Sequence, residues 1–473
     1  SLSFALRHAL THGMERVIYA IPFTSIVEQN ADVFRSLFEP LNSDVVLEHH
    51  SNFDVSQETV RSRLATQNWD APLVVTTNVQ FFESLFGYRT QQCRKLHAVA
   101  RSVVVLDEAQ AMPPGLLAPT LRALRELVEH YGVSVVLCTA TQPAIIHRND
   151  FPQGLTGVRE IIADPELLFQ RLRRVEVTQL GSLNDSAVAE RLTGHPQALC
   201  IVNTRRQAKA ISESLGEDST TIHLSAAMCP EHRTQTLDEA RRRLGEGEEI
   251  RLISTQLIEA GVDIDFPVVY RATAGLDSIA QAAGRCNRNG KLDGLGRTFV
   301  FDSEHKRAER FIGAQIDHAR EILDAHPDVL HLDAIEHYFR LHYWSHPSLD
   351  ENDVLGCFTL AERPTTPLVF NFRQAAQRFR WIDSAGVTVV VPWGRQGEEL
   401  CNRLRESEEV PPRWLLRKLQ RFSVQIRERA FEEHRNSFDV VHTHYPILVN
   451  TTLHYSDRYG LDLDSKEPIG LFA

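Results

Sequence analysis

Residues 102–110 read Ser-Val-Val-Val-Leu-Asp-Glu-Ala-Gln, and this stretch indicates the class of fold. The apolar run Val103–Leu106 predicts a strand that is buried on both faces, which is typical of parallel sheets covered by helices. Two carboxylates, Asp107 and Glu108, stand directly after the run. In sheets of this kind ligands bind at the carboxyl ends of the strands, so we expect these side chains at a functional edge.

Nine further short apolar runs predict strands of the same kind, separated by stretches with helical periodicity. The first group is Val17–Ile21, Val45–Leu47, Leu73–Thr76 and Ser134–Cys138, and the second is Ala198–Val202, Thr221–Leu224, Arg251–Ser254, Val268–Arg271 and Arg297–Phe301. With the run at residues 102–106, they predict two similar α/β lobes, each with a five-stranded parallel sheet.

The pattern changes after Asp302, which indicates further domains beyond the two lobes. We predict a first lobe over residues 1–150 and a second over residues 166–305. A helical linker is expected over residues 306–354, and a small mixed α+β accessory domain over residues 355–473. A basic helix from Pro412 to about Glu433 is expected inside that last domain.

Composition sets limits on the function. The chain has 473 residues, 42% of them hydrophobic and 24% charged, which excludes disordered, collagen-like and coiled-coil proteins. No apolar stretch approaches the roughly 18 residues of a membrane span, so no membrane partner is expected. The seven cysteines form no Cys-x-x-Cys pair, which favours a reducing, cytoplasmic location. Because the net charge is −11, any nucleic-acid site must be a local basic surface.

Asp107 and Glu108 suit metal-assisted hydrolysis. One carboxylate would hold the water shell of Mg²⁺ and the other would polarise an attacking water. The alternative is a strand followed by a solvated turn. The triplet Thr139-Ala140-Thr141 after the next strand weakens that alternative, because polar residues then stand at the ends of two successive strands.

The second lobe offers a complementary set of residues. Gly261 would let the backbone approach a nucleotide closely, while the carboxylate of Asp263 takes a ribose hydroxyl. Arg285 and Arg288 are three residues apart, so on a helix they would share one face and could reach a γ-phosphate. Alternatively, they are surface arginines with solvated head groups.

The order of these segments resembles the motif series of superfamily 2 helicases over roughly residues 15–300. The chain is more closely similar to the type I CRISPR-associated helicase–nuclease, in particular to its type I-C branch. The segments that carry the closer resemblance are IYAIPFTSIVEQNADVF at 18–34, VLEHHSNFD at 46–54, LLRKLQRFSVQI at 415–426 and YSDRYGLDLD at 455–464.

This resemblance implies two RecA-like lobes that bind ATP and Mg²⁺ at their junction. The implied catalytic residues are Asp107, Glu108, Gln110, Arg285 and Arg288, with Asp107 at the metal. Gly261, Asp263 and Gln281 would bind the nucleotide, and Thr139 and Thr141 would couple lobe closure to movement. The DNA backbone would be held by Pro22, Thr24, Thr76, Thr204, Arg205 and Thr255.

Two departures from the family carry further expectations. The sequence contains no G-x-x-x-x-G-K-[ST] phosphate loop, and the resemblance places that loop just upstream of residues 1–10. We therefore expect a fragment that starts just after the loop and has negligible ATPase activity alone. The family's histidine–aspartate nuclease is also not visible, so nuclease metals are not expected, and a nuclease fused upstream stays possible.

The function implied by the resemblance is an ATP-dependent 3′→5′ translocase on single-stranded DNA in CRISPR antiviral defence. It would be recruited by the surveillance complex Cascade at an R-loop, unwind target DNA for degradation and work as a monomer. Two alternatives stay open. The chain could come from a general superfamily 2 DNA repair or RNA helicase, or it could be a non-catalytic nucleic-acid-binding fragment.

Two further clusters allow either a functional or a structural interpretation. His49 and His50 follow a strand and could face the nucleic-acid channel, but they lack a second pair at metal-ligand spacing, as do His442 and His444. In the predicted basic helix, cations alternate with Trp414, which suits single-strand binding or an ordinary surface with Trp414 in the core.

Overall fold

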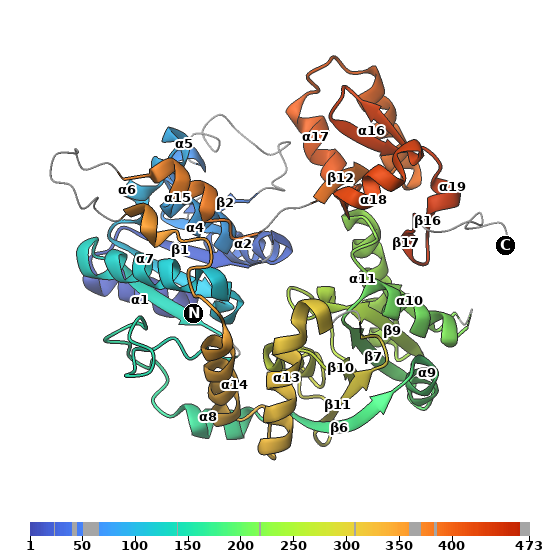
Figure 1. The fold of residues 1–473 in the computed structure, drawn as a ribbon, viewed down its shortest axis with the longest axis horizontal. Helices are drawn as coiled ribbons and strands as arrows, with labels where there is room; N and C mark the ends of the chain where they lie inside the picture. The colour runs from blue at the N-terminus through green and yellow to red at the C-terminus, as the bar shows by residue number, and fades with distance from the viewer. Residues whose placement is uncertain are drawn as a thin grey trace. The chain divides into compact units, whose positions relative to one another are not determined.

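The computed structural model describes residues 1–22, 24–39, 45–50, 66–139, 141–216, 219–306, 309–358, 370–382 and 386–463. These residues form two compact units (Figure 1). The first combines most of residues 1–165 with Ile335–Asp383, and the second combines Glu166–Ala334 with Ser384–Ala473. Each unit is therefore assembled from segments that lie far apart in the sequence.

The first unit contains a parallel sheet in the order β2-β3-β1-β4-β5. All five strands predicted for the first lobe are confirmed, and runs such as Val103–Leu106 are buried. The strands are β1 (Arg16–Ile21), β2 (Val46–His49), β3 (Leu73–Thr77), β4 (Ser102–Asp107) and β5 (Ser134–Cys138).

Helices cover this sheet through their apolar faces. Ala5 and Ala9 of α1 and Val27 and Phe34 of α2 share one buried cluster with strands β1, β3 and β4. The helices of residues 1–165 are α1 (Leu2–His12), α2 (Thr24–Phe38), α4 (Asn78–Leu85), α5 (Thr90–Cys93), α6 (Leu96–Val99) and α7 (Leu117–His130). Helix α7 is preceded by the single 3₁₀ turn Pro114–Leu116.

The second unit contains a parallel sheet of six strands, in the order β6-β11-β10-β7-β9-β8, so the prediction of five strands was wrong. The missed strand is β6, which lies at the edge of the sheet and is half-buried or exposed throughout. A strand with so little burial lacks the apolar run by which the others were found. The strands are β6 (Val175–Leu183), β7 (Gln197–Val202), β8 (Thr221–Leu224), β9 (Ile250–Thr255), β10 (Val268–Ala272) and β11 (Gly296–Ser303).

Six helices accompany this sheet. Ala208 and Ile211 of α10 belong to one buried cluster and Ala240 of α11 belongs to another, so these two helices pack on different parts of the core. The helices are α8 (Pro165–Leu172), α9 (Asp185–Thr193), α10 (Arg205–Ser214), α11 (Pro230–Glu246), α12 (Leu276–Ala283) and α13 (Glu309–Ala325).

The C-terminal part of the second unit is a small α+β domain with a mixed sheet in the order β13-β12-β15-β14. The predicted helix from Pro412 to Glu433 was wrong, because a strand interrupts it. Its elements are β12 (Gly386–Val390), α16 (Gly394–Glu406), α17 (Arg413–Gln420), β13 (Ser423–Arg427), α18 (Glu428–Glu433), β14 (Phe438–Val441), β15 (Tyr445–Leu448) and α19 (Thr451–His454), followed by the hairpin β16 (Tyr455–Ser456) and β17 (Gly460–Leu461).

Residues 335–382 return to the first lobe. Phe379 stacks on Phe86 with ring centroids 3.9 Å apart, and Trp381 stacks on Phe82 at 4.5 Å. The backbone N–H of Ala118 also donates to the carbonyl of Leu349 at 2.9 Å. This segment contains α14 (Leu332–Ser345) and α15 (Phe372–Arg378) and completes the first unit. Among the described helices none is long and apolar enough to cross a bilayer.

Candidate nucleotide and nucleic-acid sites

The adjacent carboxylates lie at the carboxyl end of β4, in the middle of the first sheet. Asp107 is the last residue of the strand, and Glu108 turns away from it in the left-handed region with φ of 51°. The side-chain oxygen of Asp107 accepts from the backbone N–H of Glu108 at 3.2 Å. Asn78, at the start of α4, donates to the carbonyl of Asp107 at 3.4 Å. The strand end is thereby held in one orientation.

A polar chain connects β4 to the end of β5. The side-chain amide of Gln110 donates to Glu108, and its carbonyl oxygen accepts from the hydroxyl of Thr139. The backbone N–H of Thr141 in turn donates to the Thr139 hydroxyl oxygen at 3.0 Å. The side-chain nitrogen and the side-chain oxygen of Gln110 therefore both have hydrogen-bond partners within the first unit. The chain joins the two residues expected to act in coupling to one of the expected catalytic carboxylates.

The electrostatics of this edge fit a divalent cation. Burial and the negative charge of Glu108 raise the pKa of Asp107 to about 6. Two adjacent carboxylates with so little water are costly when both are ionised, and a hard cation with oxygen ligands would remove that cost. The donor set of Asp107 and Glu108 therefore fits Mg²⁺.

His49 and His50 do not form an open pair. The His50 side chain is fully buried, with Nε2 2.6 Å from a carboxylate oxygen of Glu48. Nδ1 of His49 accepts from the indole N–H of Trp69 at 3.0 Å. Both rings are thus used in the core contacts of β2, which favours the structural interpretation, and residues 51–65 lie outside the described part of the chain.

In the second unit the segment after β9 is held by a buried ion pair. Nε of Arg271, on β10, lies 2.8 Å from a carboxylate oxygen of Glu259, and both side chains are buried. Arg271 also donates to the side chain of Asn203 at 2.7 Å. Gly261 has φ of 75°, a left-handed conformation that glycine adopts without strain. The ion pair fixes the segment that carries Gly261 and Asp263.

The two predicted arginines differ in environment. Helix α12, which contains the half-buried Gln281, ends at Ala283, so Arg285 and Arg288 do not share a helical turn as expected. Arg285 is buried and donates to the carbonyls of Ile258 and Glu259. Nε of Arg288 lies 2.9 Å from the exposed carboxylate of Asp263. Arg288 thus has the more accessible guanidinium group.

Three residues predicted to bind DNA gather at one edge of the second sheet. Thr204 caps α10 by accepting from the N–H of Gln207 at 3.2 Å, and Arg205 is the first residue of that helix. Thr255 ends β9, where it pairs with Val202 of β7. These three positions therefore share the carboxyl edge of adjacent strands.

The residues of the first lobe that are predicted to bind DNA differ from one another in their environments. Thr76 is fully buried, and its hydroxyl donates to the carbonyl of His49 at 2.7 Å. Pro22 is half-buried after β1, and Thr24 is the first residue of α2. Thr76 therefore exposes neither its side chain nor its backbone in this structure.

Sequence reasoning missed the supporting residues Asn78, Asn203 and Arg271. Each lies within or directly after a predicted strand and contacts a predicted site segment. For Arg271 a signal was available, because a cation inside the apolar run Val268–Ala272 requires a buried partner.

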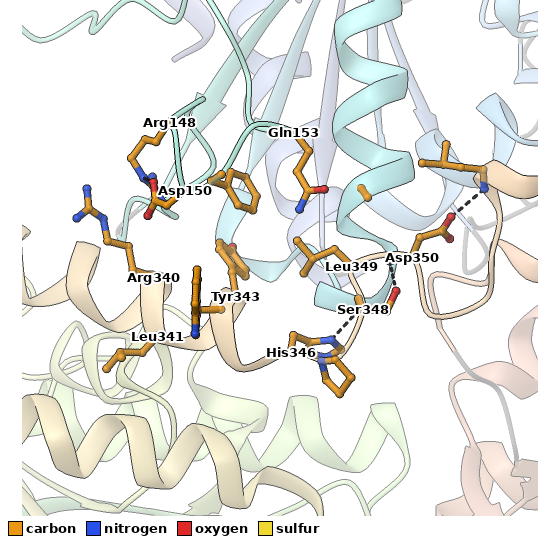
Figure 2. Close-up of a pocket in the computed structure, with 15 residues that line it drawn as sticks. Arg148, Asp150, Gln153, Arg340, Leu341, Tyr343, His346, Ser348, Leu349 and Asp350 are labelled. Atoms are coloured by element: carbon orange, nitrogen blue, oxygen red, sulfur yellow. Dashed lines mark hydrogen bonds and ion pairs between the residues drawn. The ribbon is translucent and has the colours of Figure 1, made fainter.

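A separate cavity of about 620 Å³ lies within the first unit (Figure 2). It is lined by parts of residues 148–153 and 340–355, including Arg148, Asp150 and Tyr343. Nε of Arg148 lies 3.2 Å from the carboxylate of Asp150, so that charge is neutralised inside the protein. None of the predicted site residues lines this cavity.

Comparison with known proteins shows which families this chain resembles. The DEAD/DEAH box helicase family matches residues 2–148, and the family described as the C-terminal part of the CRISPR-associated nuclease/helicase Cas3 matches residues 195–291. Together the two matches support a CRISPR-associated superfamily 2 helicase. The first matched range includes Asp107, at the carboxyl end of β4, and the second includes Thr204, which follows β7.

Individual relatives agree with this assignment. The CRISPR-associated nuclease/helicase Cas3 of Haloferax volcanii is 28% identical over 388 residues, which cover 58% of this chain and 41% of the relative. That of Methanothermobacter thermautotrophicus is 24% identical, covering 68% of this chain and 41% of the relative. The chain thus spans less than half the length of these curated relatives.

The fold is shared with solved structures. The crystal structure of T. fusca Cas3-ATP superposes with a TM-score of 0.66 at 16% identity, covering 92% of this chain and 62% of that one. A CRISPR RNA-guided surveillance complex, pre-nicking, matches with a TM-score of 0.52, covering 94% of this chain and 66% of that one. The two parallel sheets are therefore RecA-like lobes, as predicted. The assignment to the type I-C branch stays a prediction.

Proposed function

We propose that this chain forms the motor of an ATP-dependent translocase that moves on single-stranded DNA in CRISPR antiviral defence. The observation that carries the proposal is the pair of strand-end sites. One RecA-like sheet ends in half-buried, adjacent carboxylates, and the other ends in a segment with an accessible arginine and a basic helix N-terminus. This division of charge suits the binding of a nucleotide triphosphate and a polyanion.

In the proposed mechanism Asp107 would hold the water shell of a bound Mg²⁺, which would supply positive charge for the phosphates of ATP. Glu108 accepts the proton of the attacking water. Gln110 orients Glu108 and passes changes in its position to Thr139, because the three side chains form one chain of contacts. Thr141 extends this coupling through its backbone.

The second lobe supplies the remaining nucleotide-binding groups. Arg288 is the group proposed to act on the γ-phosphate, after it leaves its contact with Asp263. Arg285 is better placed to hold the segment around Ile258, because its guanidinium group already donates to two carbonyls there. Asp263 then becomes available for the ribose, and Gly261 and Gln281 are proposed to bind the same nucleotide.

The proposed substrate is the backbone of single-stranded DNA, held by Pro22, Thr24, Thr76, Thr204, Arg205 and Thr255. Contacts to phosphates carry no sequence information, which suits a motor that must travel over any sequence. We further propose that the protein acts 3′→5′ in the cytoplasm, as a monomer recruited by Cascade at an R-loop. The surveillance complex among the structures of similar fold supports that partner.

The test is Glu108→Gln in the natural protein that carries these residues. DNA-stimulated ATP hydrolysis should fall by about 10²–10⁴-fold because the general base is lost, while ATP binding is retained. The same substitution at the exposed Glu15 should leave turnover unchanged. Normal turnover of Glu108→Gln would exclude Glu108 as the base.

The general-helicase alternative differs in its dependence on partners. If the protein belongs to DNA repair or RNA metabolism, Cascade bound to target DNA should not stimulate its ATPase activity beyond the level seen with free single strands. If the chain is only a binding module, the natural protein should bind DNA and hydrolyse no ATP. Stimulation by the Cascade R-loop favours the main proposal over both.

A further inference from the structure

The loop that carries Arg288 is joined to the segment after β9 through the backbone. The N–H of Phe266 donates to the carbonyl of Arg285 at 2.9 Å, and the N–H of Asn287 donates back to the carbonyl of Phe266 at 2.9 Å. These two bonds form a short parallel bridge outside the main sheet. The two stretches of the second lobe that are proposed to bind the nucleotide are therefore tied to each other.

Two carboxylates of the segment after β9 contact the same arginine in different ways. Alternate residues of this segment are buried, namely Val262, Ile264 and Phe266. Between them Asp263 is exposed and Asp265 is half-buried. Asp263 contacts the side chain of Arg288, whereas Asp265 contacts its backbone. The two acids therefore act on separate parts of one residue.

Asp265 uses both carboxylate oxygens on the backbone of the loop. One oxygen accepts from the N–H of Arg288 at 2.7 Å, and the other accepts from the N–H of Asn289 at 3.1 Å. Hydrogen bonds to an ionised acceptor are stronger than those between neutral groups. The carbonyl of Arg288 in turn accepts from the guanidinium group of Arg174. The backbone of Arg288 is therefore held at both its nitrogen and its carbonyl oxygen.

The side chain of Arg288 is held less firmly than its backbone. Its Nε lies 2.9 Å from Asp263, and the two side chains are 43% and 77% exposed. Ion pairs this exposed contribute little to stability, because water screens the charges and two long side chains must be ordered. The guanidinium group can therefore leave Asp263 while the backbone of Arg288 stays in place.

The turn before Arg288 is ordered by a different residue. Asn287 is buried and has φ of 47°, a left-handed conformation that reverses the chain. Its side-chain nitrogen donates to the carbonyls of Arg174 at 3.2 Å and Gly294 at 3.1 Å, and its side-chain oxygen accepts from the N–H of Leu292 at 3.2 Å. Loss of the Asp265 carboxylate should therefore shift Arg288 without unfolding the loop.

We propose that Asp265 is a positioning residue for ATP hydrolysis, which fixes the backbone of Arg288 so that only the guanidinium group moves from Asp263 to the γ-phosphate. The inference rests on the proposed function and deepens it, because that function assigns Arg288 to the phosphate without saying what orients it. An arginine that stabilises the transition state must be placed accurately, and a displacement of about 1 Å can cost about 10²-fold in rate.

The test measures DNA-stimulated ATP hydrolysis by the natural protein that carries these residues. Asp265→Ala should lower kcat by about 10²-fold. The KM for ATP should stay nearly unchanged, because a contact made only in the transition state affects kcat. Asp265→Asn keeps one of the two oxygen acceptors and should lose roughly tenfold. Asp293→Ala is the matched control, since it removes the same charge from an exposed position in the loop that follows Arg288, and its kcat should equal that of the wild type.

A double-mutant cycle with Arg288→Ala separates positioning from a general structural role. If Asp265 acts through Arg288, Asp265→Ala should have almost no further effect on kcat in the Arg288→Ala background. An equal fold-loss in both backgrounds would overturn the inference. Binding of mant-ADP with and without aluminium fluoride, which mimics the transferring phosphoryl group, gives a readout independent of turnover. Asp265→Ala should lose most of the gain in affinity that aluminium fluoride gives the wild type, as transition-state contacts require.

The outcomes distinguish this inference from the function on which it rests. Wild-type kcat in Asp265→Ala, together with a large loss in Arg288→Ala, would overturn the inference and leave the proposed function standing. No hydrolysis of ATP by the wild-type protein would overturn both. Normal hydrolysis by Arg288→Ala would overturn the role of Arg288 and the inference with it. Thermal unfolding identifies any variant that fails to fold, and if Asp265→Ala does so, Asp265→Asn decides by the same measurements.

Discussion

Individual side chains in the first lobe make its stability depend on pH, in addition to their role in packing. Burial, together with the positive charges of Lys95 and His50, lowers the pKa of His49 to about 3, and the neutral ring accepts a hydrogen bond from Trp69. Burial also lowers the pKa of Lys95 to about 8. His49 is the last residue of β2, and its backbone carbonyl accepts a hydrogen bond from the buried hydroxyl of Thr76. A change in the charge of His49 or Lys95 therefore changes the stability of the first lobe.

His49→Asn should make the first unit less sensitive to acid. The unfolded histidine takes up a proton near pH 6.5, whereas the folded one does so only near pH 3, so acidification between these values favours unfolding. Below pH 4 the loss should be on the order of 2–4 kcal/mol. The Asn side chain keeps an acceptor for Trp69 without a titrating group. Urea unfolding at pH 7.5 and pH 4 measures the difference, and the same change at the exposed His130 should leave the pH dependence as in the wild type.

At the scale of elements, the hairpin of β16 and β17 attaches the C-terminal domain to the second lobe. Gly460 has φ of 77°, and a Cβ atom there would lie 2.5 Å from the carbonyl oxygen of Ala227. The next residue, Leu461, donates its N–H to that same carbonyl at 2.8 Å. The close approach of the two backbones requires glycine at this position.

Gly460→Ala should therefore destabilise the second unit by about 2–4 kcal/mol, from backbone strain and from the clash with Ala227. Gly247→Ala is the matched control, because its φ is 73° and nothing lies within 4 Å of the added Cβ. It should cost only about 1–2 kcal/mol of strain. Thermal unfolding of both variants measures the difference, and equal losses would show that the hairpin contact contributes nothing.

Sequence patterns predicted the elements that are buried and missed those that are not. The ten predicted strands are short apolar runs, and all ten are present. The exposed edge strand β6 and the two-residue strands of the hairpin carry no such run. The break in the basic helix had a signal, since Phe422, Val424 and Ile426 alternate with exposed or half-buried residues and have the period of a strand. The basic residues that precede this stretch favoured the prediction of one continuous helix, so the strand pattern was overlooked.

The candidate site was predictable to a similar extent. Residues that follow apolar runs, such as Asp107 and Thr255, could be located from the order of segments. Their supports could not, because Asn78 and Arg271 act through contacts between distant parts of the chain. The environment of Arg285 also depends on where α12 ends, and helix ends are set by tertiary contacts.

At the scale of the whole molecule, the two compact units should respond separately to changes in their cores. Phe379 is buried and stacks on Phe86 of the first lobe, so Phe379→Ala should cost that unit about 3–5 kcal/mol. Hydrogen exchange followed by mass spectrometry should show faster exchange in β1, β3 and β4 and unchanged exchange in β7, β9 and β10. Trp344→Ala, at an 80% exposed position, should alter neither set. Equal acceleration in both sheets would mean that the units unfold as one.

The return of residues 335–382 to the first lobe has a practical consequence for dividing this protein into domains. A gene shortened after the last strand of the second sheet would still encode every helicase motif found in this chain, yet the rings of Phe82 and Phe86 would lose the aromatic side chains that cover them. The shortened polypeptide would expose this apolar surface to water and would aggregate. Domain boundaries for expression should therefore follow spatial packing, with the distal segment supplied in the same chain or co-expressed as a separate peptide.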